Sequence, residues 1–435
     1  MRVKIEKLVY GGEGLAHTNG EAVFVPFVLP GEEVEIEAGE RKKKFVRGHL
    51  TRVVNASPER VDAQCPHFGV CGGCDYQHIS YEAQLRYKEQ ILRETSRRLG
   101  KIDWKDPITV HASPPWQYRN RAQWKIRPLS GDRASASVNE ASGIGYFRAG
   151  SSTLCPVEVC PILSPKLFAT FETLLSALRE GKLPETLREV EAFVDAEDRG
   201  VLLNVSCTSL PRAAETIAKM LSERIEDVKS ILIQDVRGER MSLHGPGFLQ
   251  YKVAQNSFRV GHMSFFQVNR FLVEEMASVV AAAAGSGEVA LDLYAGVGLF
   301  AMSLAKSFGH VEAVEANPAS ARDLETNAGL SGKTIAARND STEAFLAAWK
   351  RKRGVAVPDA VIVDPPRAGI EPDALEQLIE IAPQRIVYAS CDPSTLARDL
   401  AKLCAKAYAL QELYLFDMFP QTYHIEAIAR LDRVR

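Results

Sequence analysis

Long apolar segments are missing from this sequence of 435 residues. Residues 1–6 contain no apolar core of the kind that a secretory signal needs. The apolar run at 277–284 is too short to cross a bilayer. The sequence also contains no internal repeat and no low-complexity stretch. We therefore expect a cytoplasmic protein with no membrane segment, built from two to four ordinary domains.

An excess of one charge sign is also missing, because the formal net charge is only -2. The charge is unevenly distributed, however. Residues 81–133 hold twelve Lys or Arg against six acidic residues, with Tyr87, Trp116, Tyr118 and Trp124 between them, and Arg41-Lys-Lys-Lys44 is a second basic cluster. A run of charge is often only a solvated face. A basic surface with interleaved aromatics also suits a phosphate backbone with stacked bases, and both interpretations stay open at this point.

The eight cysteines favour metal binding or catalysis over disulfides in a cytoplasmic chain. Cys65, Cys71 and Cys74 form a close group, and Cys160 is a candidate fourth ligand, with Cys155 as its competitor. Four thiolates hold either a zinc ion or a [4Fe–4S] cluster, and the spacing does not separate these two. Cys207 and Cys404 lie in apolar surroundings and are expected in the core.

Changes in pattern along the chain predict an α/β protein with three domains. Residues 1–58 contain short strands separated by glycine turns, which predicts a small β-barrel. Residues 59–258 hold the cysteine group, a helix at 81–100 that could pack on the last domain, and an α+β segment. Residues 259–435 alternate apolar strands with helices, which predicts a doubly wound, Rossmann-like sheet.

A glycine-rich loop in the last domain predicts a nucleotide-like cofactor. The loop Tyr294-Ala-Gly-Val-Gly298 follows a strand and opens a helix, so Gly296 and Gly298 let a ligand approach the backbone closely. Glu315 ends the next strand and can accept hydrogen bonds from ribose hydroxyls. The glycines alone do not exclude NAD. Asp292 and Tyr294-Ala-Gly-Val-Gly298 resemble the first motif of class I methyltransferases, which bind S-adenosylmethionine.

Two further motifs lie after later strands of the same domain. Asp364-Pro-Pro-Arg367 holds an acid at the carboxyl end of the sheet, where ligands bind in open α/β folds. Cys391, in Ser390-Cys-Asp-Pro393, is a thiol at the end of a predicted strand. A lone cysteine is more often a small buried hydrophobe, but its place downstream of a cofactor loop suggests a nucleophile.

Together with His424-Ile-Glu-Ala427, these motifs resemble the RNA uracil-5-methyltransferase family over essentially the whole chain. The resemblance implies a TRAM/OB-like barrel, an iron–sulfur middle domain and a class I methyltransferase domain. It implies that Cys391 is the nucleophile and Glu426 the base. It also implies a [4Fe–4S] cluster on Cys65, Cys71, Cys74 and Cys160. The implied contacts to S-adenosylmethionine are Gln267, in Phe265-Phe-Gln-Val-Asn269, with Tyr294, Gly296, Gly298, Glu315, Asp340 and Asp364.

The expected reaction is methylation of uridine C5 in RNA. C5 is a poor nucleophile until a thiolate adds to C6, and a base must then remove the C5 proton. The expected substrate is 23S ribosomal RNA, with transfer RNA as the alternative, and we expect the protein to be a monomer. A non-catalytic iron–sulfur RNA-binding protein is a second hypothesis, and an exocyclic-amine methyltransferase is a third.

Overall fold

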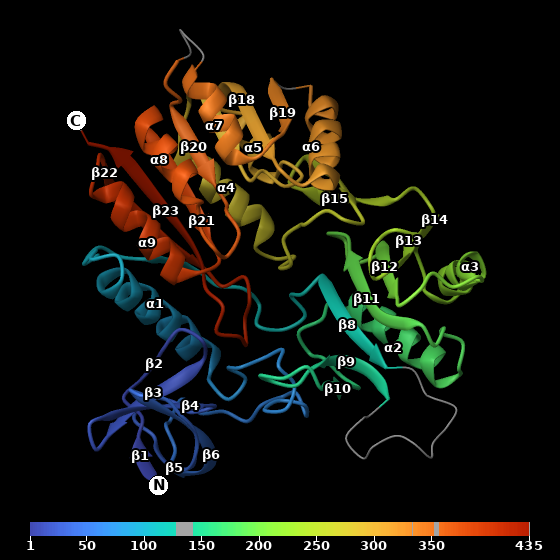
Figure 1. Ribbon diagram of the computed structural model, residues 1–435, viewed down its shortest axis with the longest axis vertical. Helices are drawn as coiled ribbons and strands as arrows, with labels where there is room; N and C mark the ends of the chain where they lie inside the picture. The colour runs from blue at the N-terminus through green and yellow to red at the C-terminus, as the bar shows by residue number, and fades with distance from the viewer. Residues whose placement is uncertain (128–141, 333, 352–355, 435) are drawn as a thin grey trace.

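The computed structural model describes residues 1–127, 142–332, 334–351 and 356–434, and three larger sheets organise them (Figure 1). The first sheet is the six-stranded barrel at the N-terminus, in the order β1-β5-β6-β4-β3-β2. Val23, Val25 and Val34 point inward and are buried, while alternate residues face solvent. The barrel strands are β1 (Arg2–Lys4), β2 (Lys7–Leu8), β3 (Glu13–Thr18), β4 (Glu21–Pro26), β5 (Glu33–Arg41) and β6 (Phe45–Asn55).

The middle sheet has one apolar face and one polar face. Alternate residues such as Trp124, Val190 and Leu203 are buried against the helices α2 (Pro165–Arg179) and α3 (Ala214–Arg224). The sheet runs β10-β9-β8-β11-β12-β13-β14. Its strands are β8 (Arg121–Arg127), β9 (Gly143–Phe147), β10 (Leu154–Pro156), β11 (Leu187–Val194), β12 (Val201–Cys207), β13 (Val228–Asp235) and β14 (Met241–His244).

The hairpin β15 (Phe248–Val253) and β16 (Asn256–Gly261) connects this sheet to the last one. The last sheet has eight strands in the order β19-β18-β17-β20-β21-β23-β22-β7. Its first five strands are parallel, and β23 runs antiparallel between β21 and β22. The strands after β17 extend the sheet first on one side, through β18 and β19, and then on the other, through β20 and β21. The switch point between β17 and β20 is where open α/β sheets bind ligands.

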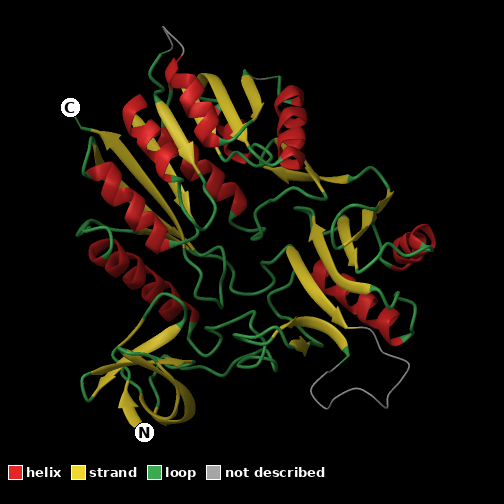
Figure 2. Ribbon diagram, in the orientation of Figure 1, coloured by secondary structure: helices red, strands yellow, loops and turns green. Residues whose placement is uncertain are grey.

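Helices cover both faces of this sheet, as Figure 2 shows. Its strands are β17 (Gly287–Leu293), β18 (Phe308–Glu315), β19 (Ile335–Asn339), β20 (Ala360–Val363), β21 (Arg385–Ser390), β22 (Tyr408–Phe416) and β23 (Glu426–Arg433). Its helices are α4 (Val273–Ala284), α5 (Leu299–Leu304), α6 (Pro318–Leu330), α7 (Thr342–Arg351), α8 (Pro372–Ile381) and α9 (Pro393–Cys404). The Asp392 side chain caps α9 by accepting from Ser394 N and Thr395 N, so the helix begins at Pro393, two residues after Cys391.

Two segments that precede the middle sheet belong spatially to the last one. Helix α1 (Tyr81–Arg98) packs along α9, and β7 (Thr109–His111) adds a parallel edge strand beside β22. The sequence pattern suggested the helix contact but assigned β7 to the middle segment. A strand of three residues with mixed exposure carries too weak a pattern to show which sheet it joins. No described helix is long and apolar enough to span a membrane.

Candidate active site

The glycine loop between β17 and α5 forms an open turn at the carboxyl edge of the last sheet. Tyr294, Gly296 and Gly298 have φ values of 64°, 56° and 95°, in the left-handed region. A Cβ at Gly296 would have no heavy atom within 4 Å, whereas one at Gly298 would lie 2.8 Å from Leu324 Cδ1. Gly296 therefore leaves space open above the loop, and Gly298 allows the loop to pack on α6.

Two carboxylates lie against this loop. Glu315, at the end of β18, accepts hydrogen bonds from Gly296 N at 2.8 Å and Asn317 N at 2.6 Å. Asp292 is fully buried and accepts from Ala301 N at 2.8 Å through Oδ2, while its Oδ1 has no partner among the described residues. Burial, helped by the charges of Asp364 and Glu315, raises the pKa of Asp292 to about 8. This edge of the sheet is therefore rich in hydrogen-bond acceptors.

The other predicted cofactor contacts lie around the same edge of the sheet, and their side chains differ in solvent exposure. The Tyr294 hydroxyl donates to Glu371 at the start of α8. Asp340 is exposed after β19, and its N–H donates to Glu315 O at 3.2 Å. Gln267 is half-buried in the segment that leads from β16 to α4. The next polar residue, Asn269, is buried, and its Nδ2 donates to Ser113 Oγ at 2.9 Å, which holds this segment in place.

The register of two strands brings Cys391 opposite Glu426. Ser390, the last residue of β21, pairs with Ala427 of the antiparallel β23. Cys391 directly follows β21, Glu426 is the first residue of β23, and the Glu426 charge acts on the Cys391 thiol. Asp364 follows the neighbouring strand β20. The three motifs of the sequence, which lie far apart along the chain, therefore converge at one point of the sheet edge.

Burial and like charges control the ionisation of these groups. Burial, together with the nearby Glu426 and Asp364 carboxylates, raises the pKa of the Cys391 thiol to about 11, against the opposing influence of Arg367. Burial raises the pKa of Asp364 to about 7, and burial and the Asp364 charge hold the pKa of Glu426 well above its ordinary value. The thiol therefore rests protonated at neutral pH beside carboxyl groups that can themselves hold a proton.

Arg367 and His424 complete this arrangement, although the sequence analysis gave them no role. The Arg367 guanidinium lies 3.0 Å from His424 Nδ1, and its positive charge lowers the pKa of the Cys391 thiol. Burial and nearby cations lower the pKa of His424 to about 4, so its ring is neutral and can accept from Arg367. Arg367 belongs to the motif Asp364-Pro-Pro-Arg367, and His424 to the motif His424-Ile-Glu-Ala427. Membership of these two motifs is the sequence feature that could have indicated a role for both residues.

The loop 417–425, which leads into Glu426, is held by residues from the first quarter of the chain. Lys88 of α1 donates to Asp417 Oδ1 at 2.6 Å, and both side chains are fully buried. Gln84 and Gln421 exchange hydrogen bonds of 3.0 Å in both directions. The N–H groups of residues 75 and 76 both donate to Gln421 O at 2.9 Å. Helix α1 and the segment before it therefore position the loop that carries the expected base.

The four predicted cysteine ligands line one cavity of about 290 Å³. Burial raises the pKa of Cys71 to about 12 and that of Cys160 to about 11, and neighbouring thiols add to the rise at Cys71. Cys155 is buried on β10 and does not line the cavity. No group of three or more His, Cys, Asp or Glu side chains among the described residues is placed to hold a metal ion directly. Cys207 is buried in the middle core and Cys404 packs beside the last one.

Strand order, glycine loop and acidic strand ends define the last domain as a class I methyltransferase fold, the fold that binds S-adenosylmethionine. The family model for tRNA (uracil-5-)-methyltransferases matches residues 80–434, and the TRAM domain model matches residues 1–51. The chain belongs to this uracil-5-methyltransferase family and is an RNA methyltransferase.

Known proteins are similar over nearly their full length. An uncharacterized RNA methyltransferase of Aquifex aeolicus is 34% identical, with 99% of this chain and 98% of that protein covered. One from Halalkalibacterium halodurans is 32% identical, with 99% and 96% covered. The crystal structure of Pyrococcus abyssi tRNA (uracil-54, C5)-methyltransferase with S-adenosyl-L-homocysteine superimposes with a TM-score of 0.75. It is 27% identical, and 99% of this chain and 100% of that one are covered.

Proposed function

We propose that this protein methylates C5 of a uridine in RNA, with Cys391 as nucleophile and Glu426 as base. The observation that supports the proposal is the pairing of Ser390 with Ala427 between β21 and β23, since the adjacent residues are a thiol and a buried carboxyl whose charges interact. A methyltransferase acting on an exocyclic amine needs neither group. A non-catalytic RNA-binding protein would have no use for the shifted pKa values that cluster here.

The residues around the glycine loop fit S-adenosylmethionine. The open space at Gly296 and the Glu315 carboxylate offer room and an acceptor for a nucleoside. Gln267, Tyr294, Gly298, Asp340 and Asp364 are the remaining proposed contacts. When bound, this cosubstrate supplies a methyl group made electrophilic by a sulfonium. The uridine must leave its base stack to reach Cys391.

The chain's own residues then carry the proton and electron movements. The Cys391 thiol gives up its proton to solvent as Sγ bonds to C6, and the C5=C6 electron pair moves toward C5 and O4. Arg367 favours the thiolate because its positive charge lies beside Sγ. After C5 has accepted the methyl group, Glu426 removes the C5 proton. The C5=C6 bond forms again and Cys391 leaves as thiolate.

An RNA that contains 5-fluorouridine tests this chemistry, because fluorine at C5 cannot be removed as a proton and the adduct persists. The wild type should form a denaturation-resistant protein–RNA adduct in the presence of S-adenosylmethionine. Cys391→Ala should form none, while Cys404→Ala, which removes a thiol distant from this edge, should still form it. An adduct that survives in Cys391→Ala would contradict the assignment of the nucleophile.

The proposed target is 23S ribosomal RNA, as the cysteine group and barrel suggest through their resemblance to that branch of the family. Transfer RNA is the second candidate, and the likeness to the Pyrococcus abyssi transfer-RNA enzyme favours it. Mapping 5-methyluridine by mass spectrometry in cells that lack the gene separates the two, since the modification disappears from one RNA class only.

We further propose that Cys65, Cys71, Cys74 and Cys160 hold a [4Fe–4S] cluster. Four thiols surrounding one cavity suit a multi-atom cluster. A single zinc ion held by the same four thiolates is the alternative. Protein purified without oxygen should contain iron and acid-labile sulfide in equal amounts, and Cys71→Ser should lose both. Colourless protein with one zinc ion would contradict the cluster.

A further inference from the structure

A second cavity, of about 450 Å³, lies on the polar face of the middle sheet. Because side chains alternate along a strand, the residues opposite the buried core all point to this face. Register places Gln123 beside Glu191, Glu191 beside Asn204, and Ser206 beside Gln234. Residues 262–265 and 268 cover one side of the cavity, and Gln267, a proposed cofactor contact, lies in the same segment. The cavity therefore shares a segment with a proposed cofactor contact but contains none of the proposed catalytic residues.

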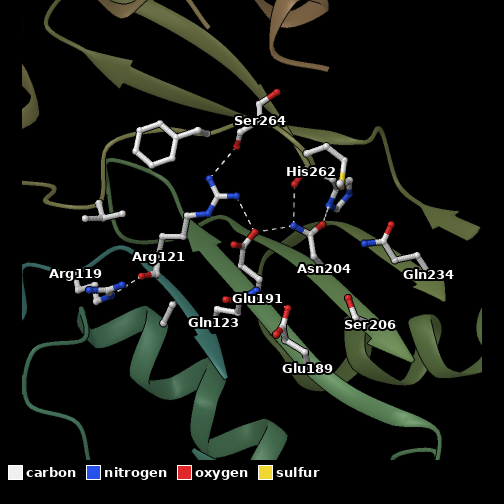
Figure 3. Close-up of a pocket in the computed structure, with 14 residues that line it drawn as sticks. Arg119, Arg121, Gln123, Glu189, Glu191, Asn204, Ser206, Gln234, His262 and Ser264 are labelled. Carbon is white, nitrogen blue, oxygen red and sulfur yellow. Dashed lines mark hydrogen bonds and ion pairs between the residues drawn. The ribbon is translucent and has the colours of Figure 1, made fainter. Parts of the chain in front are cut away.

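The polar groups of this cavity fall into two sets (Figure 3). One set is internally satisfied. Arg121 donates to Glu191 Oε1 at 2.7 Å and to Ser264 O at 2.8 Å, and Asn204 also donates to Glu191 Oε1, at 2.8 Å. His262 is buried against Asn204 Oδ1 at 2.6 Å. These contacts make the cavity wall rigid and fix the orientation of the Glu191 carboxylate.

The second set has free hydrogen-bonding capacity. Glu191 Oε2, the Gln234 amide and the Ser206 hydroxyl make no hydrogen bond to another described residue, and all three side chains line the cavity. Glu191 presents an acceptor, and Gln234 presents both a donor and an acceptor. On the rim, the Met263 and Phe265 side chains are 56% and 61% exposed, which leaves apolar surface beside these polar groups.

Charge excludes a phosphate as the ligand of this cavity. Two carboxylates lie in the cavity wall, and each is paired, Glu191 with Arg121 and Glu189 with Lys125, so Arg121 offers no free charge to an anion. A neutral, flat, polar ring with one apolar face fits better, and RNA provides it as an unstacked base read along its Watson–Crick edge. Carboxylates accept from amino groups of bases, and glutamine pairs with an amino group and a ring nitrogen together. Adenine and cytosine offer an amino donor next to a ring-nitrogen acceptor, whereas uracil offers the reverse.

We propose that this cavity binds an adenine or cytosine close to the target uridine, with Glu191 and Gln234 reading its Watson–Crick edge. The inference rests on the proposed function, because the same RNA must reach Cys391. It adds a site of sequence recognition on the middle domain, which makes the choice of uridine depend on a neighbouring base and not only on the catalytic residues.

A selection among short RNAs tests the proposal. The library carries one central 5-fluorouridine with three random nucleotides on each side, and adducts formed with S-adenosylmethionine are isolated under denaturing conditions and sequenced. For the wild type, adenine or cytosine should exceed uracil about tenfold at one flanking position. Gln234→Ala should lose most of this preference while it still forms adducts. Glu191→Gln should lose it as well, and Gln411→Ala, which removes an exposed glutamine of β22, should retain it.

Each result has a separate meaning. Wild-type adducts with no preference at any of the flanking positions would overturn the base site and leave the proposed function standing. So would a preference that persists in both Gln234→Ala and Glu191→Gln. Glu191→Gln also disturbs Arg121, so Gln234→Ala, which breaks no described contact, decides if the two variants disagree. An absence of adducts on every RNA would overturn the proposed function, and the base site with it.

Discussion

Single residues at the sheet edge acquire their chemistry from their neighbours. Cys391 sits among two carboxyl groups and one guanidinium, and the carboxyl groups and burial dominate, since the pKa of the thiol rises to about 11. Glu426 is buried beside Asp364, and burial together with the Asp364 charge raises its pKa well above the ordinary value. The ionisation of sulfur and carboxyl groups at this edge is therefore coupled.

Replacement of the base should stop the reaction halfway. With Glu426→Gln, attack by Cys391 and methyl transfer remain possible, but the C5 proton stays. We expect turnover to fall by about 10²- to 10⁴-fold, and an adduct with ordinary uridine-containing RNA to accumulate on a denaturing gel. Glu376→Gln, at an exposed position of α8, should behave as wild type. Full turnover by Glu426→Gln would exclude Glu426 as the base.

The pH dependence of thiol reactivity tests the role of Arg367. Because the raised pKa keeps Cys391 protonated, its alkylation by iodoacetamide should accelerate as the pH rises from 9 toward 11. Arg367→Leu removes the group that lowers this pKa. At pH 9 the rate should therefore drop about fivefold, the effect of roughly 1 kcal/mol. Mass spectrometry of the peptide that contains Cys391 measures the alkylation rate. An unchanged rate would refute the influence of Arg367 on the thiol pKa.

Sequence patterns predicted that the proposed catalytic residues Cys391 and Glu426 and the proposed cofactor contact Asp364 lie at one sheet edge, because each one directly follows or begins a strand. Asp364, Cys391 and Glu426 lie where strands meet the cofactor edge. The sequence motif and the position at a strand end therefore indicate the same site. Arg367 and His424 stood inside the same motifs, but their mutual contact depends on how two loops fold over the edge. No local pattern encodes a contact between residues that are 57 positions apart in the sequence.

At the scale of elements, helix α1 differs from what its composition suggested. Its Lys and Arg residues predicted an RNA-binding face, yet Lys88 is fully buried and Arg93 donates to Glu89 and to two backbone carbonyls. Farther along the basic segment, Arg121 and Lys125 pair with Glu191 and Glu189, and Arg133 lies outside the described residues. Much of the local positive charge serves internal contacts, which a charge count cannot distinguish from a free surface.

Loss of the Lys88–Asp417 ion pair should destabilise the loop 417–425, which leads into Glu426. Lys88→Met leaves the Asp417 carboxylate buried without a cation, which should lower the free energy of unfolding by about 3–5 kcal/mol. The double variant Lys88→Met/Asp417→Leu should recover most of this loss, because no buried charge remains. Lys402→Met, at an exposed lysine of α9, is the control. Urea unfolding measures all three, and equal loss in single and double variants would argue against the pair.

For the molecule as a whole, a pair of exposed lysines on the barrel offers a candidate contact for RNA phosphates. Lys43 and Lys44, between β5 and β6, are exposed and form no ion pair with a described residue. If they contact phosphates, Lys43→Ala/Lys44→Ala should weaken binding of all RNAs alike and make the slope of log affinity against log salt shallower by about 1–2. Fluorescence anisotropy at several salt concentrations measures the slope, and a steep slope kept by this variant would place the phosphate contacts elsewhere.

The contacts of the loop 417–425 also determine when the site around Cys391 can assemble during synthesis of the chain. Helix α1 and residues 75–76 leave the ribosome long before the loop 417–425 that they hold. The Tyr10 hydroxyl, from the barrel, lies 3.5 Å from the Cys391 carbonyl oxygen, 381 positions later in the chain. The active centre can therefore close only when the last residues have emerged. A nascent chain carries its barrel and cysteine group for most of translation without being able to modify any RNA it meets.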